Sequence, residues 1–172
     1  LSLIPYYKNY GFPLVYTRAT NVYGAYQQLY RIIPRTILYI KMGKKIKLQG
    51  GGKAVKSYIH IQDVCDATVK ISRNGTNGEI YHISPKDGGI SIYDLVARII
   101  IKLGEKPDDW VEIVEDRKGK DSKYIIDSSK VRNELGWVEK IDLDKGIDKV
   151  ITWVETFYEE LVNLPQEYIH KP

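Results

Sequence analysis

Asn21 and Arg117 are two candidate phosphate ligands in this sequence. The Asn21 amide can donate to a phosphate oxygen while it stays neutral. The planar guanidinium of Arg117 can donate two parallel hydrogen bonds to the same group. Each residue also has a structural interpretation, because Asn21 could shape its loop as an Asx-turn and Arg117 could pair with Asp116 or Asp121.

The charges of the sequence are segregated along the chain. Residues 1–62 hold ten Lys and Arg and no Asp or Glu, which gives this region a charge of +10, whereas the remaining 110 residues hold all 22 acids and 16 cations. Such a distribution favours an anionic partner for the first region. The alternative is a solvated basic face, and we expect that for most of its seven lysines.

Asn21 lies just beyond an expected strand. The apolar run 13–16 predicts a short buried strand, because its branched and aromatic residues are bounded by Gly11 and Pro13. A loop over 21–24 and a helix over 32–42 are expected to follow. In open α/β sheets ligands bind at the carboxyl ends of parallel strands, so this position favours a ligand site.

The remaining elements follow from periodicity and capping signals. The first expected helix ends at Gly11 and the second spans 63–73. A third follows a cap at Ser91 and ends at Gly104, and a fourth begins at Asp127 or Ser128 and ends at Gly136. The longest expected helix spans 144–161. Expected strands span 45–48, 55–61, 79–84, 110–114 and 124–126. Gly50 to Gly52 predict a turn, around which strands 45–48 and 55–61 could form an antiparallel pair.

The composition, 43% hydrophobic and 28% charged over 172 residues, is that of one soluble globular domain. No apolar run approaches the ~20 residues of a membrane span, so no membrane partner is expected. The single cysteine, Cys65, excludes an internal disulfide, favours a reducing, cytoplasmic location and is expected to fill the core. No His, Cys or carboxylate spacing predicts a metal site.

Two blocks of the sequence carry a resemblance to a known family. The first is Arg18-Ala19-Thr20-Asn21-Val22-Tyr23-Gly24 with Gln27 and Arg31-Ile32-Ile33-Pro34, and the second is Asp116-Arg117-Lys118-Gly119-Lys120-Asp121-Ser122-Lys123-Tyr124 with Asp127, Ser129-Lys130 and Glu134-Leu135-Gly136-Trp137. The first resembles extended short-chain dehydrogenases/reductases that act on nucleotide sugars, and the second is similar to dTDP-glucose 4,6-dehydratases. Together they imply an α/β fold: the C-terminal part of a Rossmann-type enzyme, with a mixed small substrate-binding domain plus the last strands and helices of the parallel sheet.

The resemblance implies a site for a nucleotide-diphosphate sugar. The family's matching Asn and Arg contact the diphosphate, so Asn21 and Arg117 are expected substrate ligands. Arg31 stands where the family usually has Lys, and Lys56 stands where it usually has Arg. Lys56 keeps the charge but loses the planar fork, so we expect weaker or less oriented phosphate binding there.

Three further expected substrate-binding residues depart from the family pattern. Gln49 replaces an aromatic residue near the base, His82 replaces an Asn close to the nucleotide, and Lys120 replaces the usual His. These departures leave the nucleotide open. A buried, hydrogen-bonded histidine is the alternative interpretation of His82, and His60 is expected to be structural.

The family's cofactor loop and catalytic base have no counterpart in the sequence. None of the fourteen glycines forms G-x-G-x-x-G, and none of the fourteen tyrosines is followed by Lys four residues later. We therefore expect no catalytic and no cofactor-binding residue, with NAD bound by the parent enzyme and not by this chain alone. Residues 1–172 are expected to form a single incomplete unit whose NAD-binding half is absent. The resemblance also implies a homodimeric parent.

Three functions fit these observations. The first is the nucleotide-sugar-binding part of an NAD-dependent 4,6-dehydratase, inactive by itself. The second is the same part of a 4-epimerase or decarboxylase; Gln27 and the block 116–124 favour the dehydratase by resemblance. The third is a basic nucleic-acid-binding module, which is disfavoured because the cations are spread over several elements and no nucleic-acid motif is present.

Overall fold

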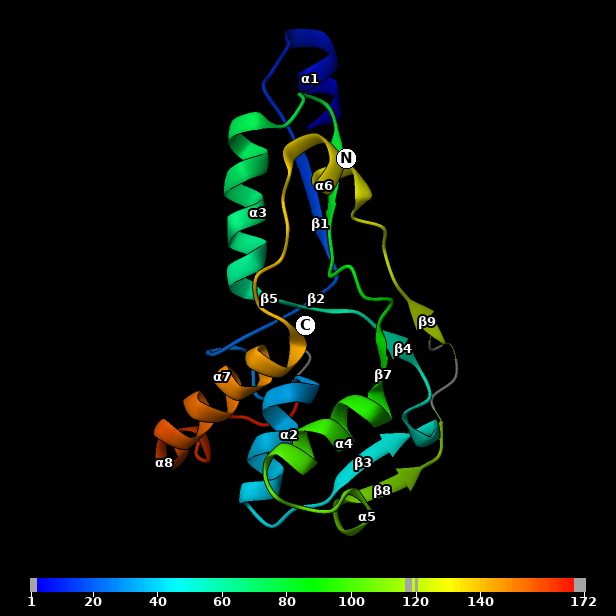
Figure 1. Cartoon of the computed structure of the whole chain (residues 1–172), viewed down its shortest axis with the longest axis vertical. Helices are drawn as coiled ribbons and strands as arrows, with labels where there is room; N and C mark the ends of the chain where they lie inside the picture. The colour runs from blue at the N-terminus through cyan, green and yellow to red at the C-terminus, as the bar shows by residue number, and fades with distance from the viewer. Residues whose placement is uncertain (1–2, 117–118, 120, 169–172) are drawn as a thin grey trace.

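The computed structural model describes residues 3–116, 119 and 121–168 (Figure 1). The helices are α1 (Ile4–Tyr10), α2 (Ile32–Lys41), the 3-10 turn η1 (Gly50–Gly52), α3 (Ile61–Asn74), α4 (Ile92–Lys102), α5 (Pro107–Trp110), α6 (Ser129–Leu135), α7 (Leu143–Thr156) and α8 (Tyr158–Leu161). The strands are β1 (Tyr16–Ala19), β2 (Asn21–Tyr23), β3 (Ile46–Gln49), β4 (Val55–Lys56), β5 (Tyr58–His60), β6 (Ile80–Ile83), β7 (Ile90–Ser91), β8 (Val111–Val114) and β9 (Lys123–Tyr124). The expected mixed α/β fold with parallel strands is confirmed.

One end of the molecule is built around the parallel pair β1 and β6, with α3 and α6 beside it (Figure 1). A buried cluster joins these elements, centred on Tyr81 of β6, Ile71 of α3 and Val131 of α6. Parallel strands need a long crossover, and the chain between β1 and β6 supplies it by way of the other end of the molecule.

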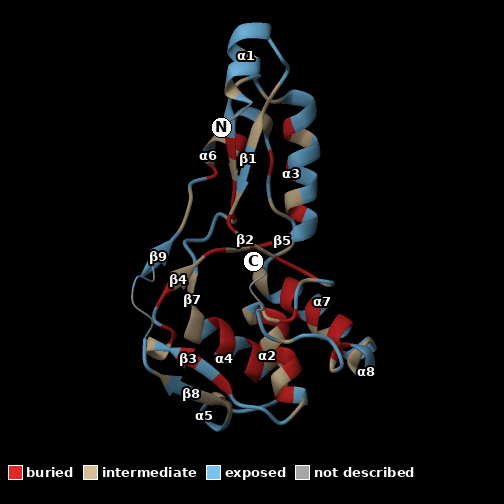
Figure 2. Ribbon diagram, turned by 180° about the vertical axis from the view of Figure 1, so that it is seen from behind, coloured by how far each residue is buried: buried red, intermediate tan, exposed pale blue. Residues whose placement is uncertain are grey.

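The other end is a helical layer with a small parallel pair. Helices α2, α4 and α7 bury one cluster that includes Ile37, Ile99 and Val150, coloured red on these helices in Figure 2. A second cluster joins α2 and α4 to β3 through Ile40, Val96 and Leu48.

The antiparallel pair predicted around the glycine turn is wrong. Strand β3 pairs in parallel with β8, while β4 pairs with β7 and β9. Gly50, Gly51 and Gly52 all have positive φ and form a 3-10 turn, which differs from the two-residue turn that joins hairpin strands. A Cβ at Gly52 would lie 2.8 Å from the Tyr93 backbone nitrogen, so the turn packs against α4 and directs the chain away from β3.

The strands β2 and β5 join the two ends of the molecule. They run in parallel, with Asn21 opposite Tyr58 and Tyr23 opposite His60, and cross the middle of the molecule in Figure 1. The loop expected over 21–24 is therefore a strand through Tyr23, since the partner β5 comes from a distant part of the sequence. Strand β1 begins at Tyr16, three residues later than the expected strand 13–16.

Several expected helix ends are confirmed. Gly11 and Gly136 cap α1 and α6 in left-handed conformations, and the Ser91 hydroxyl accepts from the Asp94 N–H at the start of α4. The single helix predicted over 144–161 is wrong, because Phe157 leaves helical geometry and divides it into α7 and α8. The Phe157 ring instead contacts that of Tyr26, at 6.1 Å between centroids.

Cys65 is exposed, so its expected place in the core is also wrong. Helix α3 turns Asp63, Ala67 and Ile71 inward, at intervals of four residues, and Cys65 lies between two of these positions on the other face. Among the described residues, no helix combines the length and the apolar character that crossing a membrane requires.

Helix α7 packs closely on the strand that carries Asn21. Gly146 is buried in α7, and a Cβ added there would overlap the Tyr23 hydroxyl and ring. The Tyr23 side chain is 2% exposed, and its hydroxyl donates to the Leu143 carbonyl at 3.5 Å.

Gly146→Ala is therefore expected to lower the free energy of unfolding by about 1–3 kcal/mol through overpacking. Helix propensity alone predicts the opposite sign, a gain of about 1 kcal/mol. Urea unfolding followed by circular dichroism measures the change. Lys149→Ala on the exposed face of α7 is the matched control, and Tyr23→Phe combined with Gly146→Ala should recover part of the loss. A Gly146→Ala chain as stable as the wild type would show that α7 can move away from β2.

His60 has the expected structural role. It is 4% exposed, its Nδ1 accepts from the Gln62 N–H at 3.2 Å at the start of α3, and its ring meets that of Tyr23 edge to face at 5.5 Å. Burial lowers the pKa of His60 and Lys149 lowers it further, against an opposing effect of Asp63. The folded state therefore favours the neutral ring.

This lowered pKa predicts a pH dependence of stability. As the pH falls below about 6.5, the unfolded state binds a proton at His60 before the folded state does, so the free energy of unfolding decreases. His60→Asn retains a side chain suited to cap α3 and does not titrate, so its stability should change less between about pH 7.5 and 5.5. Urea unfolding across this range tests the expectation, which equal losses in both chains would contradict.

Candidate functional site

A cleft of about 560 Å³ opens where β2 leads into α2. Its walls come from β2, the loop that follows, the first turn of α2 and one residue of β5. They are lined by Thr20, Asn21, Val22, Tyr23, Gln27, Gln28, Tyr30, Arg31, Ile32, Ile33 and Tyr58. The structure therefore places two of the predicted substrate ligands, Asn21 and Arg31, in one cleft.

Asn21 is held by Ser57, which lies between β4 and β5. Its backbone N–H and its side-chain amide both donate to the Ser57 carbonyl, at 3.2 and 2.9 Å. The side chain thus joins β2 to the residue between β4 and β5, which differs from the Asx-turn considered as its alternative role. An amide nitrogen carries two N–H groups, and the bond to Ser57 uses one of them.

Arg31 stands at the start of α2. It is the N-cap residue of this ten-residue helix, with extended backbone geometry, and its guanidinium carbon lies 5.5 Å from the centre of the Tyr30 ring. The first turn of α2 contains no acid. Unsatisfied N–H groups and the helix dipole give such a terminus a partial positive charge, so Arg31 and the helix end both favour an anion.

No Asp or Glu is among the residues that line this cleft. Other clefts in the described part of the chain differ in this respect. One includes Asp87, Glu139 and Asp142, and another includes Glu155, Glu159 and Glu160. The cleft between β2 and α2 is therefore the one of the three whose lining contains no acid.

Tyr58, which enters the cleft from β5, carries no functional signal in the sequence. Burial raises the pKa of Tyr58 to about 12, and it raises that of Tyr23, together with nearby Asp142, Asp63 and Asp144. Both phenols are therefore neutral hydroxyl groups at neutral pH. Only the register between β2 and β5, which places Tyr58 opposite Asn21, could have predicted its position.

Lys56 reaches this region from the neighbouring strand. It directly precedes Ser57, whose carbonyl holds Asn21, and its Nζ lies 5.4 Å from the centre of the Tyr124 ring. The pairing of β4 with β9 places Lys56 opposite Tyr124. Lys56 is half-buried and does not line the cleft itself.

The other predicted ligands lie elsewhere or outside the described residues. Gln49 is an exposed residue at the end of β3, opposite Val114 of β8. His82 is half-buried in β6, so the fully buried histidine considered as its alternative is not observed. Arg117 and Lys120 fall outside the described residues.

The glycine cluster Gly50–Gly52 and Gly24 pack against other parts of the chain. A dinucleotide site needs a glycine-rich turn between a strand and a helix that allows close backbone approach. The turn Gly50–Gly52 leads into β4 and packs against Tyr93 of α4, and Gly24 packs against Ile61. No group of His, Cys, Asp and Glu in the described part of the chain could hold a metal ion.

Comparison with known proteins places the chain among nucleotide-sugar enzymes. A family model described as GDP-mannose 4,6 dehydratase matches residues 2–150. A trifunctional enzyme of Arabidopsis thaliana, named for UDP-glucose 4,6-dehydratase and two further activities, is 34% identical over 154 residues, 89% of this chain and 23% of that protein. The dTDP-glucose 4,6-dehydratase of Escherichia coli is 32% identical over 155 residues, 85% of this chain and 43% of the enzyme.

A solved structure shows the same arrangement of elements. The dTDP-glucose 4,6-dehydratase of Bacillus anthracis, in complex with NAD, superposes with a TM-score of 0.83 at 34% identity. The match covers 90% of this chain and 48% of the enzyme, so the chain spans less than half the length of these relatives. The fold, the two sequence blocks and the family match agree, and the chain belongs to the GDP-mannose 4,6-dehydratase family of extended short-chain dehydrogenases/reductases.

Proposed function

We propose that this chain supplies the diphosphate-binding surface of an NAD-dependent nucleotide-sugar 4,6-dehydratase. The observation that carries the proposal is the acid-free cleft in which Asn21, Arg31 and the start of α2 come together. A diphosphate placed there would accept hydrogen bonds from the Asn21 amide and the Arg31 guanidinium, and its charge would be stabilised by the helix dipole.

The chain's contribution to this activity is to bind and orient the substrate. NAD, bound by the parent enzyme, would supply the hydride chemistry at C4 of the sugar, with loss of water across C5 and C6. None of the described residues is assigned a part in those steps. The relatives are named for UDP-glucose and for dTDP-glucose, so both nucleotides are tested below.

Calorimetric titration with UDP, dTDP and UMP tests the binding surface. Asn21→Ala and Arg31→Ala are each expected to weaken UDP or dTDP binding by about 10- to 100-fold, because each removes a hydrogen bond to a charged group worth about 1.5–3 kcal/mol. The effect on UMP should be smaller because the second phosphate is missing.

Arg73→Ala, which removes an exposed arginine from α3, is the matched control and should leave binding unchanged. Urea unfolding of each variant separates binding from folding. If both site variants bind the nucleoside diphosphates as tightly as the wild-type chain, the diphosphate does not occupy this cleft. Binding that is equally strong for unrelated RNA and falls steeply with salt would support a nucleic-acid-binding module instead.

The purified chain alone is expected to convert neither dTDP-glucose nor UDP-glucose, even with NAD added. It lacks the family's tyrosine and lysine pair and its glycine-rich turn. Mass spectrometry would detect product as the loss of one water from the sugar. The Escherichia coli dehydratase, assayed in parallel with dTDP-glucose, is the positive control. If the chain alone forms product, the proposal that it binds the substrate without catalysing the reaction is overturned.

A further inference from the structure

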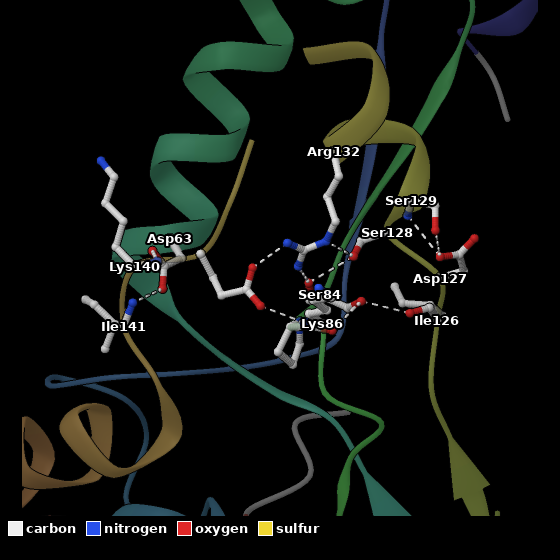
Figure 3. Close-up of polar contacts among 12 residues, drawn as sticks. Asp63, Ser84, Lys86, Ile126, Asp127, Ser128, Ser129, Arg132, Lys140 and Ile141 are labelled. Atoms are coloured by element: carbon white, nitrogen blue, oxygen red, sulfur yellow. Dashed lines mark hydrogen bonds and ion pairs between the residues drawn. The ribbon is translucent and has the colours of Figure 1, made fainter. Parts of the chain in front are cut away.

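A half-buried network centred on Arg132 of α6 joins three segments of the chain (Figure 3). The Arg132 guanidinium donates through Nη2 to the Ser84 carbonyl at 2.9 Å and through Nε to the Ser128 hydroxyl at 3.0 Å. Its Nη1 forms an ion pair with Glu139 at 2.6 Å. One planar side chain therefore holds the end of β6, the start of α6 and the segment that follows α6.

The two serines extend this network to the chain that precedes α6. The Ser84 hydroxyl donates to the Ile126 carbonyl at 2.8 Å, and the Ser128 hydroxyl donates to the Ser84 carbonyl at 3.0 Å. Both serines are buried, at 1% and 5% exposed. Residues 126–128 are thus fixed against the end of β6, and Arg132 donates to both sides of the junction.

Glu139 and Trp137 hold the guanidinium in place. The side chains of Arg132 and Glu139 are each 17% exposed, and Glu139 also accepts from the Lys86 N–H at 2.7 Å. Burial acts to raise the pKa of Glu139, but the hydrogen bonds from Arg132 and Lys86 outweigh it and the pKa lies below its usual range. The Trp137 ring stacks on the guanidinium at 4.9 Å.

The joined segments lead to predicted substrate ligands. His82 lies two residues before Ser84 in β6. Strand β9, which ends two residues before Ile126, pairs with β4 and places Tyr124 against Lys56. Lys56 in turn precedes Ser57, which holds Asn21. Contacts and short stretches of chain therefore link Arg132 through β9 and β4 to the candidate cleft.

We infer that Arg132 is a positioning residue for the diphosphate site, acting through β9 on Lys56 and, through the adjoining Ser57, on Asn21. This inference rests on the proposed function. Arg132 does not line the cleft of Asn21 and Arg31, so it acts by holding other residues. The fork is required, because the ion pair and the two hydrogen bonds come from three different nitrogens of one rigid group.

UDP titrations of Arg132→Ala and Arg132→Lys test the role of the fork. At a temperature where circular dichroism shows every chain folded, Arg132→Ala should weaken UDP binding by about tenfold, within the range measured for coupled residues. Arg132→Lys keeps the charge and should recover only part of the affinity. Lys130 is a second cation of α6, and its ion pair is with Glu79. Lys130→Ala is the control and should leave UDP binding unchanged.

A double-mutant cycle with Lys56→Ala separates positioning from general destabilisation. If Arg132 acts through Lys56, Arg132→Ala should lose most of its effect on UDP binding in the Lys56→Ala background, while the effects of the two substitutions on unfolding free energy add. Should Arg132→Ala fail to fold, Arg132→Lys and Ser128→Ala, which removes two hydrogen bonds of the network, complete the same cycle.

The outcomes distinguish this inference from the proposed function. A wild-type chain that binds no nucleoside diphosphate overturns the proposed function, and the inference with it. A wild-type chain that binds UDP, with Arg132 variants that bind it equally well, overturns the inference alone. If Arg132→Ala weakens UDP binding equally with and without Lys56→Ala, the inference is also overturned, because Arg132 would then not act through Lys56.

Discussion

The parallel ladder between β2 and β5 is the constraint on which the rest of the structure depends. These two three-residue strands are far apart in the sequence, and their pairing connects the β1–β6 end of the molecule to its helical end. The ladder also determines which side chains face the cleft, since it sets Asn21 opposite Tyr58. A one-residue shift in register would reverse these side chains, so the close contact between Gly146 of α7 and Tyr23 supports the site as well as the core.

Much of the fold was predictable because local signals agreed with tertiary structure. The amphipathic stripes of α2, α3, α4 and α7 and the glycine or serine caps each act within a few residues. Strand pairing was not predictable in the same way. The glycine turn after β3 favoured a hairpin, but the partners of β3 and β4 are fixed by packing on α4 and by strands 34 or more residues away. Phe157 likewise leaves helical geometry and contacts Tyr26. The periodicity of the helix could not predict this contact with a distant residue.

The candidate site shows the same division. The charge pattern and the first sequence block predicted Asn21 and Arg31, because both lie in one short segment that ends a strand and begins a helix. Tyr58 and Arg132 were missed. Neither stands out by residue type, and their importance comes from the β2–β5 register and from the junction between β6 and α6. Family membership supports a nucleotide-sugar enzyme, and the acid-free lining of one cleft is the basis of our proposal for the diphosphate surface.

The bond between Asn21 and the Ser57 carbonyl has a consequence for affinity. A free asparagine would lose rotamer entropy when it orients toward a ligand, and that loss would weaken binding. Here folding has already restricted the side chain, through a hydrogen bond of 2.9 Å to the Ser57 carbonyl. The amide is therefore preorganised. A hydrogen bond from its second N–H to a ligand would cost little further side-chain entropy, so most of the energy of that bond would contribute to affinity.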